Sequence, residues 1–208
     1  MLIQDFLSLA REGELRNINL SDEAYTETIL GYINLGLIEL YKRFPLKTKE
    51  FLIANTSEGT FTLPDDCMQV IEAYGSIPTA SGDPLVIDLP LNDVDSPYSV
   101  YIPTYNQVQI PFMENDVVVS IIYAATPPYL TMLDVTNNIP LPIPDQLIEA
   151  LLNYVGYRAH GSMDSNVNSE TTTHYQRFEN SCKRVELLGL YIFDGTSAKN
   201  RLYERGFV

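Results

Sequence analysis

The stretch SDEAYTETILGYINLGLIELYKRFP, residues 21–45, predicts a helix over Asp22–Arg43. Ser21 fits the N-cap position, and the acids of the first turn lie near the positive end of the helix dipole. Lys42 and Arg43 occupy the last turn, and Pro45 ends the helix. The apolar residues recur at spacings of three and four, which predicts one buried stripe of Ile29, Leu30, Ile33, Leu37, Leu40, Tyr41 and Phe44.

Three more helices are expected on either side of this one. A short helix is predicted over Ile3–Arg11, and longer ones over Asp145–His160, which Pro144 introduces, and Asn168–Leu188. The predicted buried stripes of the last two are Leu147, Ile148, Leu151, Leu152, Val155 and Ala159, and His174, Phe178, Cys182, Val185 and Leu188. Because the link at residues 161–165 is short, these two helices are expected to pack as an antiparallel hairpin.

The middle of the chain has the pattern of β structure. Strands are predicted at Glu50–Ala54, Thr60–Leu63, Cys67–Tyr74, Ser99–Ile102, Gln107–Ile110 and Asp116–Ala125. The cluster NTSEG at residues 55–59 predicts a hairpin-like turn between the first two strands. The run VVVSIIY at residues 117–123 is the most β-prone in the chain, and we expect it at the centre of its sheet. Prolines predict a loop-rich region at 76–98 and a crossing segment at 130–144.

These elements predict an α+β fold with a helical core. The core would be formed by residues 1–47 and 127–190, with a small antiparallel β domain inserted at residues 48–126. Residues 191–208 match neither a helix nor a strand, and we interpret them as an extended C-terminal arm.

The charge of the chain is concentrated in its middle. The 108 residues from Glu50 to Tyr157 contain no lysine or arginine and 14 acidic residues, which equals the formal charge of −14 of the whole chain. The flanking segments balance, with 13 acidic and 13 basic residues. A nucleic-acid-binding surface needs basic residues to displace counterions from phosphates, so the middle segment does not fit that function. It fits a surface that repels DNA or meets a basic partner, and solubility alone is the alternative.

The residues needed for catalysis, cofactor binding or export are missing from the sequence. There is no GxSxG, P-loop, GxGxxG or HExxH motif, so we expect no enzyme activity, no cofactor and no metal. His174 is interpreted as a core or interface histidine, with a metal ligand or a base as the alternative, and Cys67 and Cys182 are interpreted as apolar core residues. The acids Asp145 and Glu149 are interpreted as complementing a helix dipole. Because an acid lies near the N-terminus, we do not expect the chain to be exported. Because the sequence has no run of 18 consecutive apolar residues, we do not expect a transmembrane helix.

Two segments resemble a known family. The first is IPLPIPDQLIEALLNYVGYRAH, residues 139–160, and the second is FTLPDD, residues 61–66, which precedes a predicted strand. The order of elements is also similar: a helix ending in YKRFP, a β insertion, two helices and a loose C-terminal arm. The chain thereby resembles the head-to-tail connector or adaptor proteins of tailed bacteriophages, most closely the tail tubular A-like adaptor of short-tailed phages.

The resemblance implies a structural virion protein at the head–tail junction, assembled in the host cytoplasm. Such adaptors bind below the portal ring as a collar of twelve copies, extend the DNA channel and provide the platform for the tail. The implied partners are the portal protein, the tail nozzle or tail tube protein, and neighbouring copies of the chain, with DNA passing through without sequence-specific binding. The C-terminal arm would bind the portal or a neighbour through Phe193, Lys199, Arg201, Tyr203, Arg205 and Phe207.

The anionic middle segment gains an expected role from this resemblance. We expect its acids to be divided between the channel lumen and the tail platform: Asp88, Asp93, Asp95, Glu114 and Asp116. The alternatives are another phage neck component, such as a stopper or tail-completion protein, a hydrolase-like or metal-dependent enzyme, and a nucleic-acid-binding module. The helix hairpin counts against a stopper or tail-completion protein. The missing motifs count against an enzyme, and the lysine-free middle segment counts against a nucleic-acid-binding module.

Overall fold

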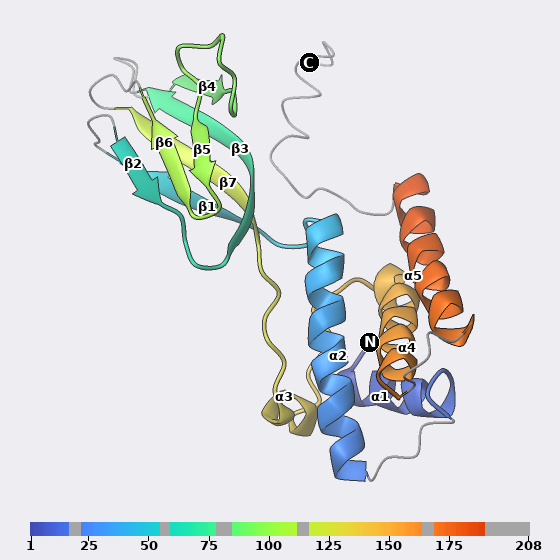
Figure 1. The fold of residues 1–208 in the computed structure, drawn as a ribbon. Helices are drawn as coiled ribbons and strands as arrows, with labels where there is room; N and C mark the ends of the chain where they lie inside the picture. Colours follow the sequence, from blue (N-terminus) through green and yellow to red (C-terminus); the bar gives the residue numbers. More distant parts are fainter. Residues whose placement is uncertain (17–21, 55–58, 78–84, 112–116, 164–168, 190–208) are drawn as a thin grey trace, which may run out of the picture. The chain divides into compact units, whose positions relative to one another are not determined.

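The computed structural model describes residues 1–16, 22–54, 59–77, 85–111, 117–163 and 169–189 (Figure 1). These residues contain five α-helices and seven strands, and all strand pairs are antiparallel, which confirms the predicted α+β class. The chain divides into two compact units. We call residues 1–46 together with 127–208 the helical unit, and residues 47–126 the β unit.

The helical unit is built on the long helix that the sequence predicts. Its helices are α1 (Ile3–Glu12), α2 (Asp22–Arg43), α3 (Met132–Thr136), α4 (Ile148–Met163) and α5 (Ser169–Leu187), and a 3-10 turn, η1 (Asp145–Leu147), leads into α4. The bounds of α2 are those predicted, and all seven residues of its predicted stripe are buried. The described residues do not include Ser21, so its predicted capping role lies outside them.

Helices α4 and α5 run antiparallel, as three ring contacts show. Tyr154 contacts Phe178 with 5.3 Å between ring centroids, and Tyr157 contacts Tyr175 at 5.2 Å. His160 stacks on His174 at 5.0 Å. Residue numbers rise along α4 as those of their partners fall along α5, which is the register of an antiparallel pair. Leu188, predicted to be buried, is instead 63% exposed and lies just beyond the end of α5.

Helix α2 packs closely on α4 and also holds the chain that returns from the β unit. A Cβ atom at Gly36 would lie 2.6 Å from Leu151 Cδ1 and 3.0 Å from the ring of Tyr154, so only glycine fits without movement. The buried Asn34 side chain accepts a hydrogen bond from Leu130 N at 2.8 Å and donates one to Leu130 O at 2.9 Å. These contacts satisfy both backbone groups of a residue in an irregular segment.

The β unit contains two antiparallel sheets around one core. Strands β1 (Thr48–Ile53), β7 (Val118–Ala125), β3 (Cys67–Ile77) and β4 (Leu85–Leu89) form the first sheet in that order. Strands β2 (Gly59–Thr62), β6 (Gln107–Ile110) and β5 (Tyr101–Thr104) form the second. The described core comprises Ile53, Leu63, Val70, Ala73, Val100, Val108, Ile110, Val117, Val119 and Ile121. β7 lies between β1 and β3, and this central place is the one predicted from its composition.

One local prediction was wrong, and two segments contain an element that was not predicted. The expected hairpin does not form, because β1 pairs with β7 and β2 pairs with β6 in the other sheet. The region expected to be loop-rich contains β4, which among the described strands pairs with β3 alone and lies at the edge of its sheet, where flanking prolines are tolerated. The crossing segment contains α3, whose start is capped reciprocally by Thr131 and Asp134.

Candidate interaction surfaces

Only part of the site predicted from the sequence lies among the described residues. The six arm residues, Phe193, Lys199, Arg201, Tyr203, Arg205 and Phe207, lie outside them. Glu114 and Asp116 also lie outside them. The other three acids belong to the β unit, and all three are exposed: Asp88, Asp93 and Asp95.

Asp88 lies on β4 opposite Tyr74 of β3. The phenol of Tyr74 donates a hydrogen bond to the carboxylate of Glu72 on its own strand. Burial, followed by this hydrogen bond and the charges of Glu72 and Asp88, raises the pKa of Tyr74, so the phenol remains protonated. The β3–β4 edge therefore presents two carboxylates with a neutral tyrosine between them.

Asp93 and Asp95 lie on a separate loop, residues 91–100, which is closed by its own hydrogen bonds. Asn92 N bonds Val100 O at 2.9 Å, and Asn92 adopts a positive φ of 53°. The buried Ser99 hydroxyl accepts a hydrogen bond from Asp93 N at 2.8 Å, and Asp93 Oδ1 accepts one from Asp95 N at 3.0 Å. The backbone of this loop is therefore held in place while its acidic side chains face solvent.

Two apolar side chains accompany these acids on the 91–100 loop. Val94, between Asp93 and Asp95, is 85% exposed, and Tyr98 is 55% exposed. The loop therefore presents an apolar tip flanked by two carboxylates. Asp93 and Asp95 were predicted from the sequence as interaction residues, whereas Val94 was not.

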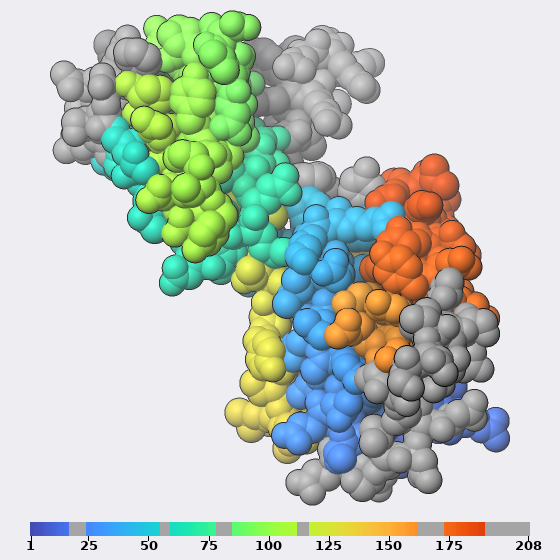
Figure 2. All heavy atoms as spheres, in the orientation of Figure 1, coloured from blue at the N-terminus to red at the C-terminus, as the bar shows by residue number. Residues whose placement is uncertain are grey.

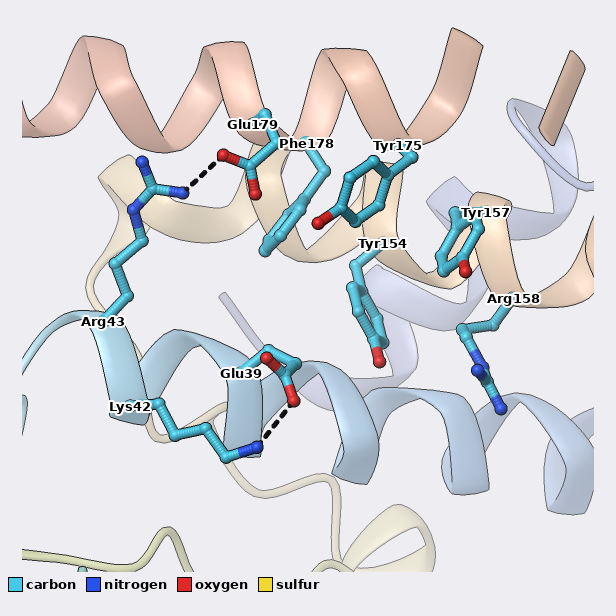
Figure 3. Close-up of a pocket in the computed structure, with 9 residues that line it drawn as sticks. All are labelled: Glu39, Lys42, Arg43, Tyr154, Tyr157, Arg158, Tyr175, Phe178 and Glu179. Carbon is cyan, nitrogen blue, oxygen red and sulfur yellow. Dashed lines mark hydrogen bonds and ion pairs between the residues drawn. The ribbon is translucent and has the colours of Figure 1, made fainter. Parts of the chain in front are cut away.

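The helical unit has a pocket of about 340 Å³ where α2, α4 and α5 meet (Figure 3). We call it the tyrosine pocket. On the face shown in Figure 2, α4 (orange) reaches the surface between α2 (blue) and α5 (red). Each of the three helices supplies three lining residues: Glu39, Lys42 and Arg43; Tyr154, Tyr157 and Arg158; Tyr175, Phe178 and Glu179.

Four aromatic rings form one wall of the tyrosine pocket and point into it (Figure 3). Tyr154 meets Phe178 edge-on and Tyr157 at 5.9 Å between ring centroids. Tyr154 and Phe178 are buried, whereas Tyr175 is 44% exposed, so the aromatic wall extends from the core of the helical unit to its surface. Burial raises the pKa of Tyr154, and the Glu179 carboxylate raises that of Tyr175, so both stay neutral near pH 7. Sequence reasoning missed this wall; the i, i+3 spacing of aromatic residues on both helices was the available signal.

The charged residues of the tyrosine pocket are unequally paired. Arg43 makes two hydrogen bonds to the carboxylate of Glu186, at 2.6 and 3.1 Å, and an ion pair with Glu179 at 3.0 Å. Lys42 pairs with Glu39 at 2.8 Å. Arg158 is exposed and has no carboxylate partner among the residues that the structure describes. Among the described residues that line the pocket, Arg158 is therefore the cation that is left to meet an external anion.

The two histidines lie together with Glu14 at the other end of the helix pair. His160 Nε2 lies 2.9 Å from the backbone oxygen of Glu14, and His174 Nδ1 lies 3.3 Å from its carboxylate. The two imidazole planes differ by 6°. His174 is 8% exposed, as expected for a core histidine. This cluster attaches the segment after α1 to α4 and α5.

The remaining candidates for chemistry have structural partners. Asp145 pairs with the N-terminal amine of Met1 at 3.0 Å, and Glu149 pairs with Arg184 at 3.3 Å, so each of the two acids has its own cationic partner. Across the described ranges, no group of three or more His, Cys, Asp or Glu side chains is placed to hold a metal ion.

Cys67 and Cys182 are both free thiols, and burial raises the pKa of Cys182 to about 11. That shift keeps the Cys182 thiol protonated near pH 7 and therefore unreactive.

None of the helices in the described part of the chain is long and apolar enough to span a membrane.

Comparison with known proteins gives one family. Residues 2–195 match the SU10 adaptor protein family, a stretch that includes the whole β unit, most of the helical unit and both segments on which the phage-adaptor resemblance rests. No curated protein gives a significant match. The family is one of structural phage adaptors and is not a known enzyme family. The chain therefore belongs to the SU10 adaptor protein family and is a phage adaptor protein.

Proposed function

We propose that this protein is a head-to-tail adaptor that binds below the portal ring as a collar of twelve copies. It extends the DNA channel and provides the attachment platform for the tail nozzle or tail tube protein. The observation that carries the proposal is the family match over residues 2–195, because it spans the helical unit and the β unit together. The protein would act at the virion head–tail junction after assembly in the host cytoplasm.

The C-terminal arm, residues 191–208, is the proposed contact with the portal or with a neighbouring copy. From Lys183 to Val208 the chain has five basic and three acidic residues, a charge opposite in sign to that of the β unit. Aromatic residues and arginines supply most of the binding energy in protein interfaces. Phe193, Tyr203 and Phe207 would therefore be the anchors of the arm, and Lys199, Arg201 and Arg205 its charged contacts.

The β unit supplies the anionic surface of the proposed channel and platform. It contains 11 acidic residues and two lysines, a formal charge of −9. One of these lysines, Lys49, is already paired with Asp66 at 2.5 Å. A surface of this charge repels the phosphates of DNA, so DNA would slide past it without binding. The exposed Asp88, with Glu114 and Asp116, would face the lumen or the tail platform.

Reconstitution with the portal protein of the same genome tests the proposal. Negative-stain imaging and light scattering should show a collar on the portal ring, and deletion of residues 191–208 should abolish it. Tyr105→Ala is the matched control, because Tyr105 is 87% exposed in the β unit and has no part in the proposed arm. Absence of association at every salt concentration would contradict the adaptor function and favour a stopper or tail-completion protein.

A further inference from the structure

We propose that the 91–100 loop of one copy binds the tyrosine pocket of a second copy, with Val94 against the aromatic wall and Asp93 or Asp95 beside Arg158. This contact would join neighbouring copies in the proposed ring, and it rests on the proposed function. Asp93 and Asp95 would then face a neighbouring subunit and not the channel lumen or the tail platform.

The pocket has the features of a site for a short apolar segment that carries negative charge. Its volume of about 340 Å³ is at the small end of the range for ligand pockets, so it fits one or two side chains and not a helix. The aromatic wall offers apolar surface that is only partly covered within the chain, since Tyr175 is 44% exposed. Arg158 lies at the edge of this wall in Figure 3 and is drawn without an ion-pair partner.

The 91–100 loop has the complementary features. Val94 is an apolar side chain that is 85% exposed and lies between two carboxylates that have no cation partner among the described residues. The hydrogen bonds to Ser99 and Asn92 already order the loop, so little conformational entropy is lost when it binds. Charge and apolar character therefore match on both sides.

The contact joins two different surfaces, one in the β unit and one in the helical unit. Contacts of this heterologous kind between identical chains generate closed rings or open filaments, whereas isologous contacts stop at dimers. The β units repel one another because each has a formal charge of −9, and pairing their acids with arginines of neighbours reduces that repulsion. A contact of this size is weak by itself and gains strength when the portal holds many copies together.

Crosslinking between two differently substituted copies tests the contact without the portal. One chain carries Val94→Cys and the other Lys42→Cys, both with Cys67→Ala, because Cys67 is half-buried whereas Cys182 is fully buried. Lys42 lines the pocket and is exposed, and its replacement leaves the rings and Arg158 in place. A short bis-maleimide should join the mixed chains about tenfold faster than two control mixtures. In the first control mixture, Tyr129→Cys replaces Lys42→Cys in the pocket chain. In the second, Tyr105→Cys replaces Val94→Cys in the loop chain. Both tyrosines are exposed and lie outside the two surfaces.

Charge reversal then tests whether Arg158 and the loop acids form the contact. Arg158→Glu in the pocket chain should lower the crosslinking rate about tenfold, because like charges would meet. Asp95→Lys in the loop chain should restore it, since the Asp95 side chain makes no described hydrogen bond that holds the loop. Arg16→Glu, at an exposed arginine outside the pocket, should leave the rate unchanged.

Crosslinking no faster than in the controls, or unaffected by Arg158→Glu, would overturn the proposal. Loss of the crosslink when the portal is added would also overturn it, because the portal would then occupy the pocket. The crosslinking experiment needs no portal, so a protein that forms no collar on the portal can still show the crosslink. Failure of the proposed contact can therefore be distinguished from failure of the proposed adaptor function.

Discussion

Asn34 is a polar residue inside the helical core, and its importance comes from its two hydrogen bonds to Leu130. Asn34→Ala leaves the N–H and C=O groups of Leu130 buried without partners, and we expect it to lower the free energy of unfolding by about 3 kcal/mol. Urea denaturation measures the change. Asn180→Ala, at an exposed position of α5, is the control and should change stability by less than about 0.5 kcal/mol. Equal effects of the two substitutions would show that the hydrogen bonds at Asn34 contribute little.

Arg43 connects the end of α2 to α5 through Glu186 and Glu179. Its hydrogen bonds lower the pKa of Glu186 below the ordinary value of 4.5, so folding favours the ionised carboxylate. This contribution is fully present above the pKa of Glu186 in the unfolded chain, and it is lost as the pH falls through the lower pKa of the folded protein.

We therefore expect Arg43→Gln to lower the free energy of unfolding by about 1 kcal/mol at pH 7, since solvent screens this partly exposed pair. The difference from the unsubstituted protein should shrink below pH 4.5, the ordinary pKa of Glu186. Denaturation at several pH values measures it. Arg184→Gln breaks a more exposed pair and should cost less; a difference independent of pH would mean that Arg43 acts through packing instead.

At the scale of elements, the packing of α2 on α4 distinguishes two glycines of the same helix. A Cβ atom at Gly31 meets nothing within 4 Å, so Gly31→Ala should raise the free energy of unfolding by about 0.5–1 kcal/mol through helix propensity. Gly36→Ala should lower it by about 1 kcal/mol, because Leu151 and Tyr154 must move within a filled core. Thermal denaturation of both variants followed by circular dichroism provides the comparison. Stabilisation by both would show that the α2–α4 contact adjusts freely.

The strands show which parts of an element can be predicted locally. The composition of β7 was sufficient to predict its central place, because its run of β-branched residues favours a strand that is paired with a neighbour along both edges. The composition of β1 and β2 did not predict their partners. A turn between two strands normally indicates a hairpin, but here each strand pairs with a strand distant in sequence, so the backbone hydrogen bonds belong to different sheets.

At the scale of the whole molecule, each unit has its own buried core. We expect calorimetry to resolve two unfolding transitions, because separate cores unfold as separate cooperative units. Ile121→Ala should lower the midpoint temperature of the β-unit transition alone, and Leu151→Ala that of the helical-unit transition alone. Each substitution should lower the free energy of unfolding of its own unit by about 3 kcal/mol. A single transition shifted equally by both substitutions would mean that the two units unfold cooperatively.

The sequence by itself determined the α+β class, the extent of α2 and the similarity to phage adaptors. These depend on local patterns: the 3.6-residue period, the residues at helix ends, and short motifs at residues 61–66 and 139–160. The tertiary structure alone decided the strand partners and the tyrosine pocket. Arg43, Tyr157 and Tyr175 lie far apart in sequence and come together only because α2, α4 and α5 pack side by side. Local patterns determine the face that an element buries, whereas the packing of whole elements determines which residues meet.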